Sequence, residues 1–181
     1  MISRTLPAST FLDALTIHSR SVGGANTIQE NIYIQITPDH IRTSTNNLET
    51  MTVYDVPVQG KGSAEALVDF KRFMAMVKLM TTVEIAIDEE KRLVVLNKGQ
   101  VKLSGRNPDD YNTIPNRPEP VMFIENGKKF SASIKRCDFA MKRDASGLAG
   151  VSLSNVGNLL SICAADGALL AKDDTIQLTG D

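Results

Sequence analysis

One pattern occurs three times in this sequence, at intervals of about 60 residues, and it restricts the possible folds more than any other feature. In each copy a residue suited to starting a helix stands four positions before a phenylalanine. The three pairs are Pro7 and Phe11, Asp69 and Phe73, and Asn126 and Phe130. Proline fits the opening of a helix, and Asp or Asn side chains accept hydrogen bonds from its free N–H groups. The chain is therefore expected to contain three related helices.

Each phenylalanine begins a stripe of mainly apolar side chains spaced by four, three and four residues, which places them on one helix face. The stripes are Phe11, Leu15, His18 and Val22; Phe73, Val77 and Met80; and Phe130, Ile134, Cys137 and Met141. With their caps, the helices are expected over residues 8–22, 69–80 and 127–143. The histidine at position 18 is interpreted as a core residue, because it occupies an apolar position.

Period-two alternation follows each helix, which is typical of strands with one buried face. It appears at Ile32, Ile34 and Ile36, at Val83, Ile85 and Ile87, and at Val151 and Leu153. Turn residues then lead to a further strand near Ile41, near 93–95 and near Leu159, and to another near Met51 and near Val101. The repeated unit is therefore predicted to be βαβββ.

A single βαβββ repeat cannot cover its own apolar helix stripe and sheet face, whereas two repeats side by side can. This predicts an α+β fold with paired helices packed on one face of antiparallel sheets. Repeats one and two would form a first domain, residues 1–117, followed by a proline-rich connector over 112–120. Residues 118–181 would then hold repeat three, half of a second domain, as expected of a fragment or a truncated gene product.

Composition excludes several classes of protein. No apolar run approaches the roughly 18 residues of a membrane span, and no signal peptide is visible. The two cysteines, Cys137 and Cys163, do not form a CxxC motif, which favours a reduced, cytoplasmic setting.

Charge is divided unevenly between the predicted helices and the rest of the chain. The three helix segments carry ten basic and three acidic side chains, or +7, against a chain total of −1, so the remainder carries −8. Lys71, Arg72 and Lys78 stand to Phe73 as Lys128, Lys129 and Lys135 stand to Phe130, whereas the first helix has Ser9, Thr10 and Thr16 at these positions. On the second and third helices, these cations are expected to lie on the face opposite the apolar stripe.

A single basic helix face is usually only solvated. Two helices with cations at matched positions, against an acidic remainder, favour contact with a phosphate backbone. The predicted DNA-binding residues are Arg20, Lys71, Arg72, Lys78, Lys128, Lys135, Arg136, Lys142 and Arg143. No base-reading motif is present, so binding would be sequence-independent and salt-sensitive.

The sequence resembles the bacterial DNA polymerase III beta subunit, the sliding DNA clamp, along essentially the whole chain. The similarity rests on three stretches, which are 43–49 (Thr-Ser-Thr-Asn-Asn-Leu-Glu), 66–111 (from Ala-Leu-Val-Asp-Phe-Lys-Arg-Phe to Asp-Asp-Tyr), and 139–171 (from Phe-Ala-Met to Ala-Asp-Gly-Ala-Leu-Leu-Ala). No single stretch is decisive, and the resemblance is supported by their order and spacing together with the repeat.

This resemblance implies a ring of six similar domains from two head-to-tail subunits, with helices lining the hole and no catalysis. It implies duplex DNA, a DNA polymerase and a clamp loader as partners, and self-association into a ring in the full-length form. The present chain would supply the first domain and half of the second. Since the ring contact of the family uses a third domain, the 181-residue chain alone is not expected to close a ring.

The sequence departs from the family at two places. Gly23-Gly24 is followed by Ala25-Asn26, where the family often has an arginine that contacts DNA. The middle-domain turn usually reads Asp-Gly-His-Arg-Leu and helps form a pocket for partner peptides, but here His and Arg are replaced. The resemblance implies a partial pocket at Leu148, Asp166, Gly167, Leu169 and Leu170.

No catalytic constellation is found, and no metal or cofactor is expected. The acidic pairs Asp109-Asp110 and Asp173-Asp174 could bind a cation, but loop acids are usually solvated. Two alternatives remain open. The chain could be a non-catalytic protein-interaction scaffold that uses its outer sheet and does not bind DNA, or a nucleic-acid enzyme with an active site of an unfamiliar type.

Overall fold

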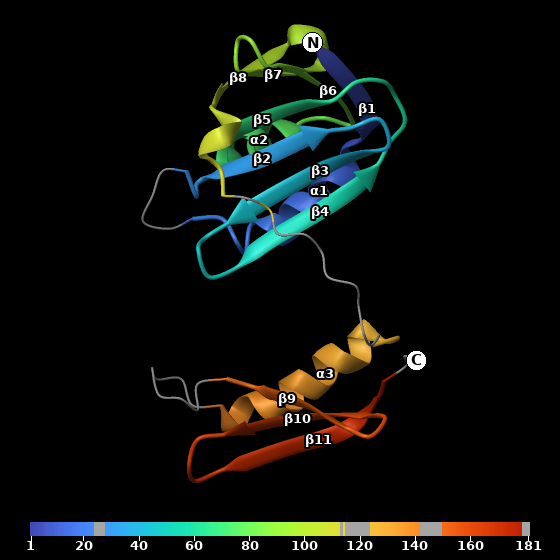
Figure 1. Cartoon of the computed structure of the whole chain (residues 1–181), viewed down its shortest axis with the longest axis vertical. Helices are drawn as coiled ribbons and strands as arrows, with labels where there is room; N and C mark the ends of the chain where they lie inside the picture. The colour runs from blue at the N-terminus through green and yellow to red at the C-terminus, as the bar shows by residue number, and fades with distance from the viewer. Residues whose placement is uncertain (24–27, 113, 115–123, 142–149, 179–181) are drawn as a thin grey trace. The chain divides into compact units, whose positions relative to one another are not determined.

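The computed structural model describes residues 1–23, 28–112, 114, 124–141 and 150–178. The chain divides into two compact units, Met1–Pro115 and Asn116–Asp181, here called the N-terminal unit and the C-terminal unit (Figure 1). Each is described by itself.

The N-terminal unit contains two βαβββ repeats in one eight-stranded antiparallel sheet. The first repeat consists of β1 (Ile2–Pro7), α1 (Ala8–His18), β2 (Asn31–Ile36), β3 (His40–Asn46) and β4 (Met51–Pro57). The second consists of β5 (Ala64–Asp69), α2 (Phe70–Val77), β6 (Thr82–Asp88), β7 (Leu93–Leu96) and β8 (Val101–Arg106), with short 3₁₀ turns at Asn97–Gly99 and Pro108–Asp110. These elements match the predicted repeat, and the α+β fold is confirmed.

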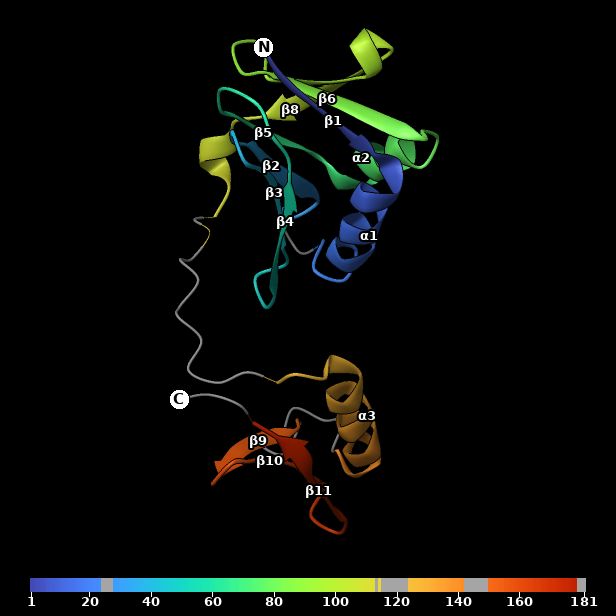
Figure 2. The ribbon, with the colours of Figure 1, turned by 90° about the vertical axis from the view of Figure 1, so that its right-hand side faces the viewer.

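Strand order shows how the two repeats are joined. The sheet runs β1-β6-β7-β8-β5-β2-β3-β4. The first strand of each repeat pairs with the second strand of the other, β1 with β6 and β5 with β2. Both helices lie on the same face of this sheet (Figure 2). The exchange of first strands therefore makes one domain out of two halves.

The core of the N-terminal unit lies between the helices and the sheet. Phe11 of α1 and Phe73 of α2 are fully buried and meet edge to face, with ring centroids 5.7 Å apart. Around them pack side chains of β2 and β6 that point from the sheet toward the helices, including Ile34 and Ile85. Burying one such aromatic or aliphatic side chain contributes roughly 1.5–3 kcal/mol. The two apolar stripes that define the repeat therefore stabilise each other directly.

The predicted helix starts are confirmed. The side chain of Asp69 accepts a hydrogen bond from the Arg72 N–H at 2.7 Å, and that of Asn126 accepts one from the Lys129 N–H at 3.0 Å. Pro7 precedes α1 directly, as expected.

The predicted helix ends are wrong, because each helix tightens after its last full turn. After α1 the Arg20 and Ser21 N–H groups donate to carbonyls three residues back, and after α2 the Leu79 N–H does the same. Such 3₁₀ bonds satisfy the last carbonyls but rotate the chain off the helix register. Val22 and Met80 still pack against the core, although they lie beyond the helices.

The C-terminal unit contains one helix on a three-stranded antiparallel sheet. It comprises α3 (Gly127–Cys137), a 3₁₀ turn at Asp138–Ala140, and strands β9 (Ser152–Val156), β10 (Leu159–Ala165) and β11 (Leu170–Gln177). The sheet order is β11-β10-β9, and α3 packs on one face of this sheet (Figure 2). The core between them contains Cys137, Leu160 and Ile162. The first strand predicted for repeat three falls largely on residues outside those described.

A buried polar network connects α1 to the sheet. The fully buried His18 ring bonds through Nδ1 to Thr45 Oγ1 at 2.9 Å and through Nε2 to Thr43 Oγ1 at 2.8 Å. Ser21 extends the network to Thr45 and Thr52. Hydroxyl groups can either donate or accept, so they satisfy both ring nitrogens of a neutral histidine. The prediction of a core histidine is confirmed.

This histidine makes the N-terminal unit acid-sensitive. Burial lowers the pKa of His18 from 6.5 to about 4, so below pH 6.5 the unfolded chain takes up a proton that the folded chain does not. Stability is therefore lost as the pH falls from 6.5 toward 4, by about 3 kcal/mol in total. We expect His18→Gln to remove this loss. All three tyrosines lie in this unit, so tyrosine fluorescence during urea unfolding reports it.

The matched control is His40→Gln, which removes the other histidine and should keep the acid sensitivity. A His18→Gln protein that loses stability between pH 6.5 and 4 as steeply as the parent would contradict the assignment.

Candidate nucleic-acid interface

The outer face of α2 presents three cations. Lys71, Arg72 and Lys78 are exposed, while Phe73 and Val77 on the opposite face are buried. Lys71 and Arg72 lie in the first turn, and Lys78 caps the last one. The arrangement follows from the helix period, because the positions one and two residues before the buried phenylalanine and five residues after it point away from the sheet.

The outer face of α3 repeats this arrangement. Lys128, Lys129 and Lys135 are exposed, and Cys137 and Ser133 are buried against the sheet. The three lysines hold the same positions relative to Phe130 as the α2 cations hold relative to Phe73. We call the three exposed cations of each helix, on α2 in the N-terminal unit and on α3 in the C-terminal unit, its basic helix surface.

Helix α1 lacks this surface. At the matched positions it has Ser9, Thr10 and Thr16, and the Thr16 hydroxyl donates to the Leu12 carbonyl at 2.8 Å within the helix. Arg20 is exposed but lies beyond the end of α1.

Arg136, also predicted to contact DNA, has a structural partner. Its Nε and Nη2 atoms both lie 2.5 Å from Asp173 Oδ2 on β11, and Nη2 also donates to Ser133 Oγ at 2.9 Å. Only 5% of the Asp173 side chain is exposed, against 54% for Arg136. Hydrogen bonds from Arg136 and Thr175 hold the pKa of Asp173 well below its usual range. Arg136 therefore neutralises a buried carboxylate and joins α3 to the sheet.

Three of the predicted site residues, Lys142, Arg143 and Leu148, lie outside the described residues.

Of the predicted partner-peptide residues, Asp166, Gly167 and Leu169 lie in the turn between β10 and β11, and Leu170 begins β11. Asp166 Oδ1 accepts the N–H groups of Ala168 at 2.8 Å and Leu169 at 2.7 Å, and Gly167 has a φ of +94°. This closed turn leaves Leu169 and Leu170 exposed. The four described residues thus form one turn that presents two exposed leucines.

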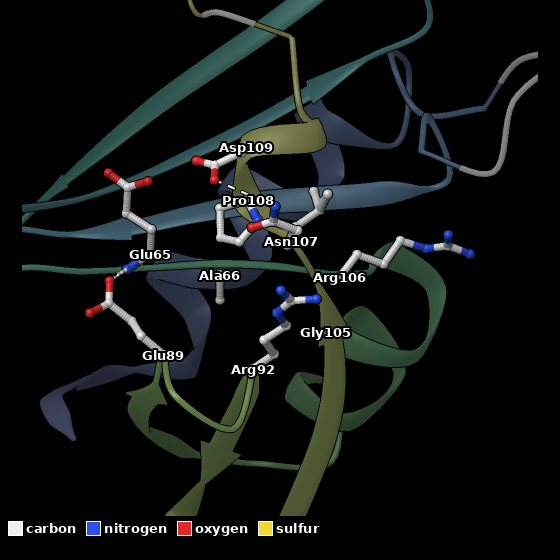
Figure 3. Close-up of a pocket in the computed structure, with 10 residues that line it drawn as sticks. Glu65, Ala66, Glu89, Arg92, Gly105, Arg106, Asn107, Pro108 and Asp109 are labelled. Atoms are coloured by element: carbon white, nitrogen blue, oxygen red, sulfur yellow. Dashed lines mark hydrogen bonds between the residues drawn. The ribbon is translucent and has the colours of Figure 1, made fainter.

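Among the described residues, most exposed acids lie in the turns and loops rather than in the helices. On the sheet of the N-terminal unit a hollow of about 290 Å³ lies between β5 and β8, at the lower limit for small-ligand pockets. Figure 3 shows Glu65 and Glu89 on one side of it and Arg92 and Arg106 on the other. The Glu65 N–H donates to Glu89 Oε1 at 2.9 Å, so one carboxylate is used by the backbone. The mixed charges favour no single ligand class.

Sequence reasoning missed this hollow, although Gly105 gives a signal for it. A Cβ at Gly105 would lie 2.8 Å from the Leu67 carbonyl oxygen, so only glycine permits the short pairing of β8 with β5. Beyond that pairing the two strands separate.

Other chemistry is sparse in the described part of the chain. No group of three or more His, Cys, Asp or Glu side chains there could hold a metal ion. Burial raises the pKa of the Cys137 thiol, which disfavours a reactive thiolate. No described helix is long and apolar enough to cross a membrane.

Comparison with solved structures identifies the architecture. The beta subunit of DNA polymerase from Streptococcus pyogenes matches 99% of this chain and 50% of its own length, with a TM-score of 0.84 at 19% identity. The DNA polymerase III subunit beta from Pseudomonas aeruginosa matches 99% of this chain and 52% of its own length, with a TM-score of 0.82 at 22% identity. The fold is that of the sliding clamp.

A third solved structure, the Helicobacter pylori beta clamp bound to a DNA ligase peptide, matches 99% of this chain and 53% of its own length. Its TM-score is 0.76 at 12% identity. This chain therefore spans about half the length of the clamps that it matches. No protein-family model and no curated protein matches the sequence.

The role of Arg136 can be tested by stability. We expect Arg136→Met to destabilise the C-terminal unit by about 1–3 kcal/mol, because it leaves Asp173 buried without its cation. Lys135→Met, at the adjacent exposed position, is the control and should have little effect. Amide hydrogen exchange of α3 and β11 measures both. Equal protection in Arg136→Met and the parent would show that the ion pair contributes no stability.

Proposed function

We propose that this chain is the first half of a sliding clamp, a non-catalytic processivity factor that holds duplex DNA and tethers a replicative DNA polymerase. The observation that carries the proposal is the basic helix surface, with three cations on α2 repeated at the same positions on α3. A clamp architecture without this surface would support the fold alone.

Electrostatics supports contact with the phosphate backbone. Lys71, Arg72 and Lys78 project from one short helix whose first turn contains no acidic residue. The Asp69 carboxylate caps the helix N-terminus through the Arg72 N–H, so the positive charge of this face comes from the three side chains and not from the helix dipole. Such contacts neutralise phosphates and release counterions without reading base edges, as expected of a protein that slides along DNA.

Partner binding is the second part of the proposal. The exposed Leu169 and Leu170 would contribute apolar contacts to a peptide site for the polymerase, the clamp loader or a ligase. The chain spans half of a clamp, so encircling DNA and forming a ring would require further domains. Two free cysteines fit a reducing, cytoplasmic setting.

The proposal is tested by duplex binding against salt, measured by fluorescence anisotropy of a labelled DNA of unrelated sequence. We expect weak binding at low salt that weakens steeply as salt is added. The triple variant Lys71→Ala, Arg72→Ala, Lys78→Ala should bind more weakly, and its log K against log salt slope should be smaller by about 3. Lys128→Ala with Lys135→Ala should act in the same direction.

A charge-matched control is available in the same unit. Lys91, Lys98 and Lys102 line a hollow on the sheet, so replacing them with alanine removes the same charge from another face. Equal losses in the two triple variants would show that net charge, rather than the helix surface, determines binding. Absence of duplex binding at low salt would favour the alternative of a protein-interaction scaffold.

A further inference from the structure

A second hollow lies on the sheet of the N-terminal unit, on the face turned away from the helices. It is formed by β1, β6, β7, β8 and the turns that join the last three, and it measures about 550 Å³. This volume lies within the usual range for ligand sites, about 300–1,000 Å³. The proposed DNA contact uses the opposite face, so the hollow has no part in it.

Strand register produces this hollow. Ser3, Ala86, Val95 and Lys102 are successive partners across the four strands, so their side chains share one face of the sheet. Ile85, next to Ala86, belongs to the core, and alternate strand residues point to opposite faces, so the row lies on the outer face. Two members of the row, Ser3 and Ala86, have short side chains, and these leave space between the longer side chains around them.

The lining of the hollow is apolar in the middle and charged at the sides. Val95 is buried and Leu93 is half-buried, and both come from β7. Lys98 of the β7–β8 turn and Lys102 of β8 are exposed, and neither forms an ion pair with another described residue. Glu84 of β6 lines the other side.

The third lysine of the hollow is already paired. Lys91 Nζ lies 3.4 Å from Asp88 Oδ2, and Asp88 Oδ1 accepts the Lys91 N–H at 3.2 Å. This pair adds little net charge, so two unpaired cations on one side face the Glu84 carboxylate on the other. Such an arrangement attracts an anion to the lysines and repels it from β6.

The position of Lys98 is fixed by an unusual turn. Asn97 and Lys98 have left-handed backbone, with φ of +47° and +56°, and Gly99 follows with a φ of +94°. Lysine seldom adopts this conformation. Asn97 Oδ1 accepts the Glu84 N–H at 2.9 Å and so joins the turn to β6. Backbone strain of this kind is concentrated at functional sites.

We propose that this hollow binds a short acidic peptide segment of a partner protein, in which an apolar side chain is flanked by glutamate or aspartate. The apolar side chain would contact Leu93 and Val95, and the flanking carboxylates would pair with Lys98 and Lys102. Repulsion by Glu84 would fix the orientation of the segment. None of the residues that line the hollow is aromatic, so it offers no ring on which a nucleic-acid base stacks, and this favours a peptide over a nucleotide. The inference does not rest on DNA binding.

The test is an NMR titration of the isotope-labelled whole chain with an end-capped synthetic peptide, Glu-Glu-Leu-Glu-Glu. We expect saturable shifts at the amides of β6, β7, β8 and the 97–99 turn. Lys98→Gln with Lys102→Gln should raise the dissociation constant by about fivefold, and Glu84→Gln should lower it by about twofold, because it removes the repelling charge. The opposite sign of the two effects separates them from a general loss of structure.

The matched control is Lys71→Gln with Lys78→Gln, which removes the same charge from α2 and should bind the peptide like the parent. The peptide Glu-Glu-Ser-Glu-Glu should bind more weakly, since it lacks the apolar side chain. Absence of saturable shifts in these strands, or equal binding by the Lys98→Gln, Lys102→Gln protein, would overturn the proposal. Equal shifts caused by inorganic phosphate or by a thymidine oligonucleotide would also overturn it, because they would show a site for any anion.

Discussion

A βαβββ repeat has more apolar surface than it can cover alone, and this constraint determines the rest of the structure. In the N-terminal unit it is met by exchange of first strands and by the contact between Phe11 and Phe73. The exchange places both helices on one face of a single sheet. Because that contact buries one stripe of each helix, the opposite stripe is left free to carry charge.

This geometry determines where the cations of the basic helix surface can stand. The positions available for cations are fixed by the buried phenylalanine, and repeats two and three fill them in the same way. Repeat one shares the packing but not the cations, so the charge is not required by the fold. Its occurrence on α2 and α3 but not on α1 is the observation that supports the proposal of a polyanion contact.

Much of the fold could be predicted because its signals are local. Asp69 and Asn126 mark helix starts through hydrogen bonds three residues away, and the alternating isoleucines of β2 mark a strand. The helix ends were wrong because the 3₁₀ turns that stop them depend on how the chain enters the next segment. The periodicity of the sequence does not indicate where these turns form.

The site was only partly predictable. Exposure of Lys71 and Lys128 follows from helix period, whereas the pairing of Arg136 with Asp173 joins residues 37 apart in sequence and leaves no local pattern. The exposure of Leu153 could be seen only in the structure, because the alternation in the sequence predicts a buried strand residue at this position.

The central claim is that the helices, and not the sheets, face DNA. The most direct measurement is NMR of the isotope-labelled chain, with backbone amides followed while a short duplex is added at low salt. We expect shifts concentrated in α2, α3 and the residues that cap them, with the signals of β6, β7 and β8 unchanged. Shifts confined to those strands would contradict the account.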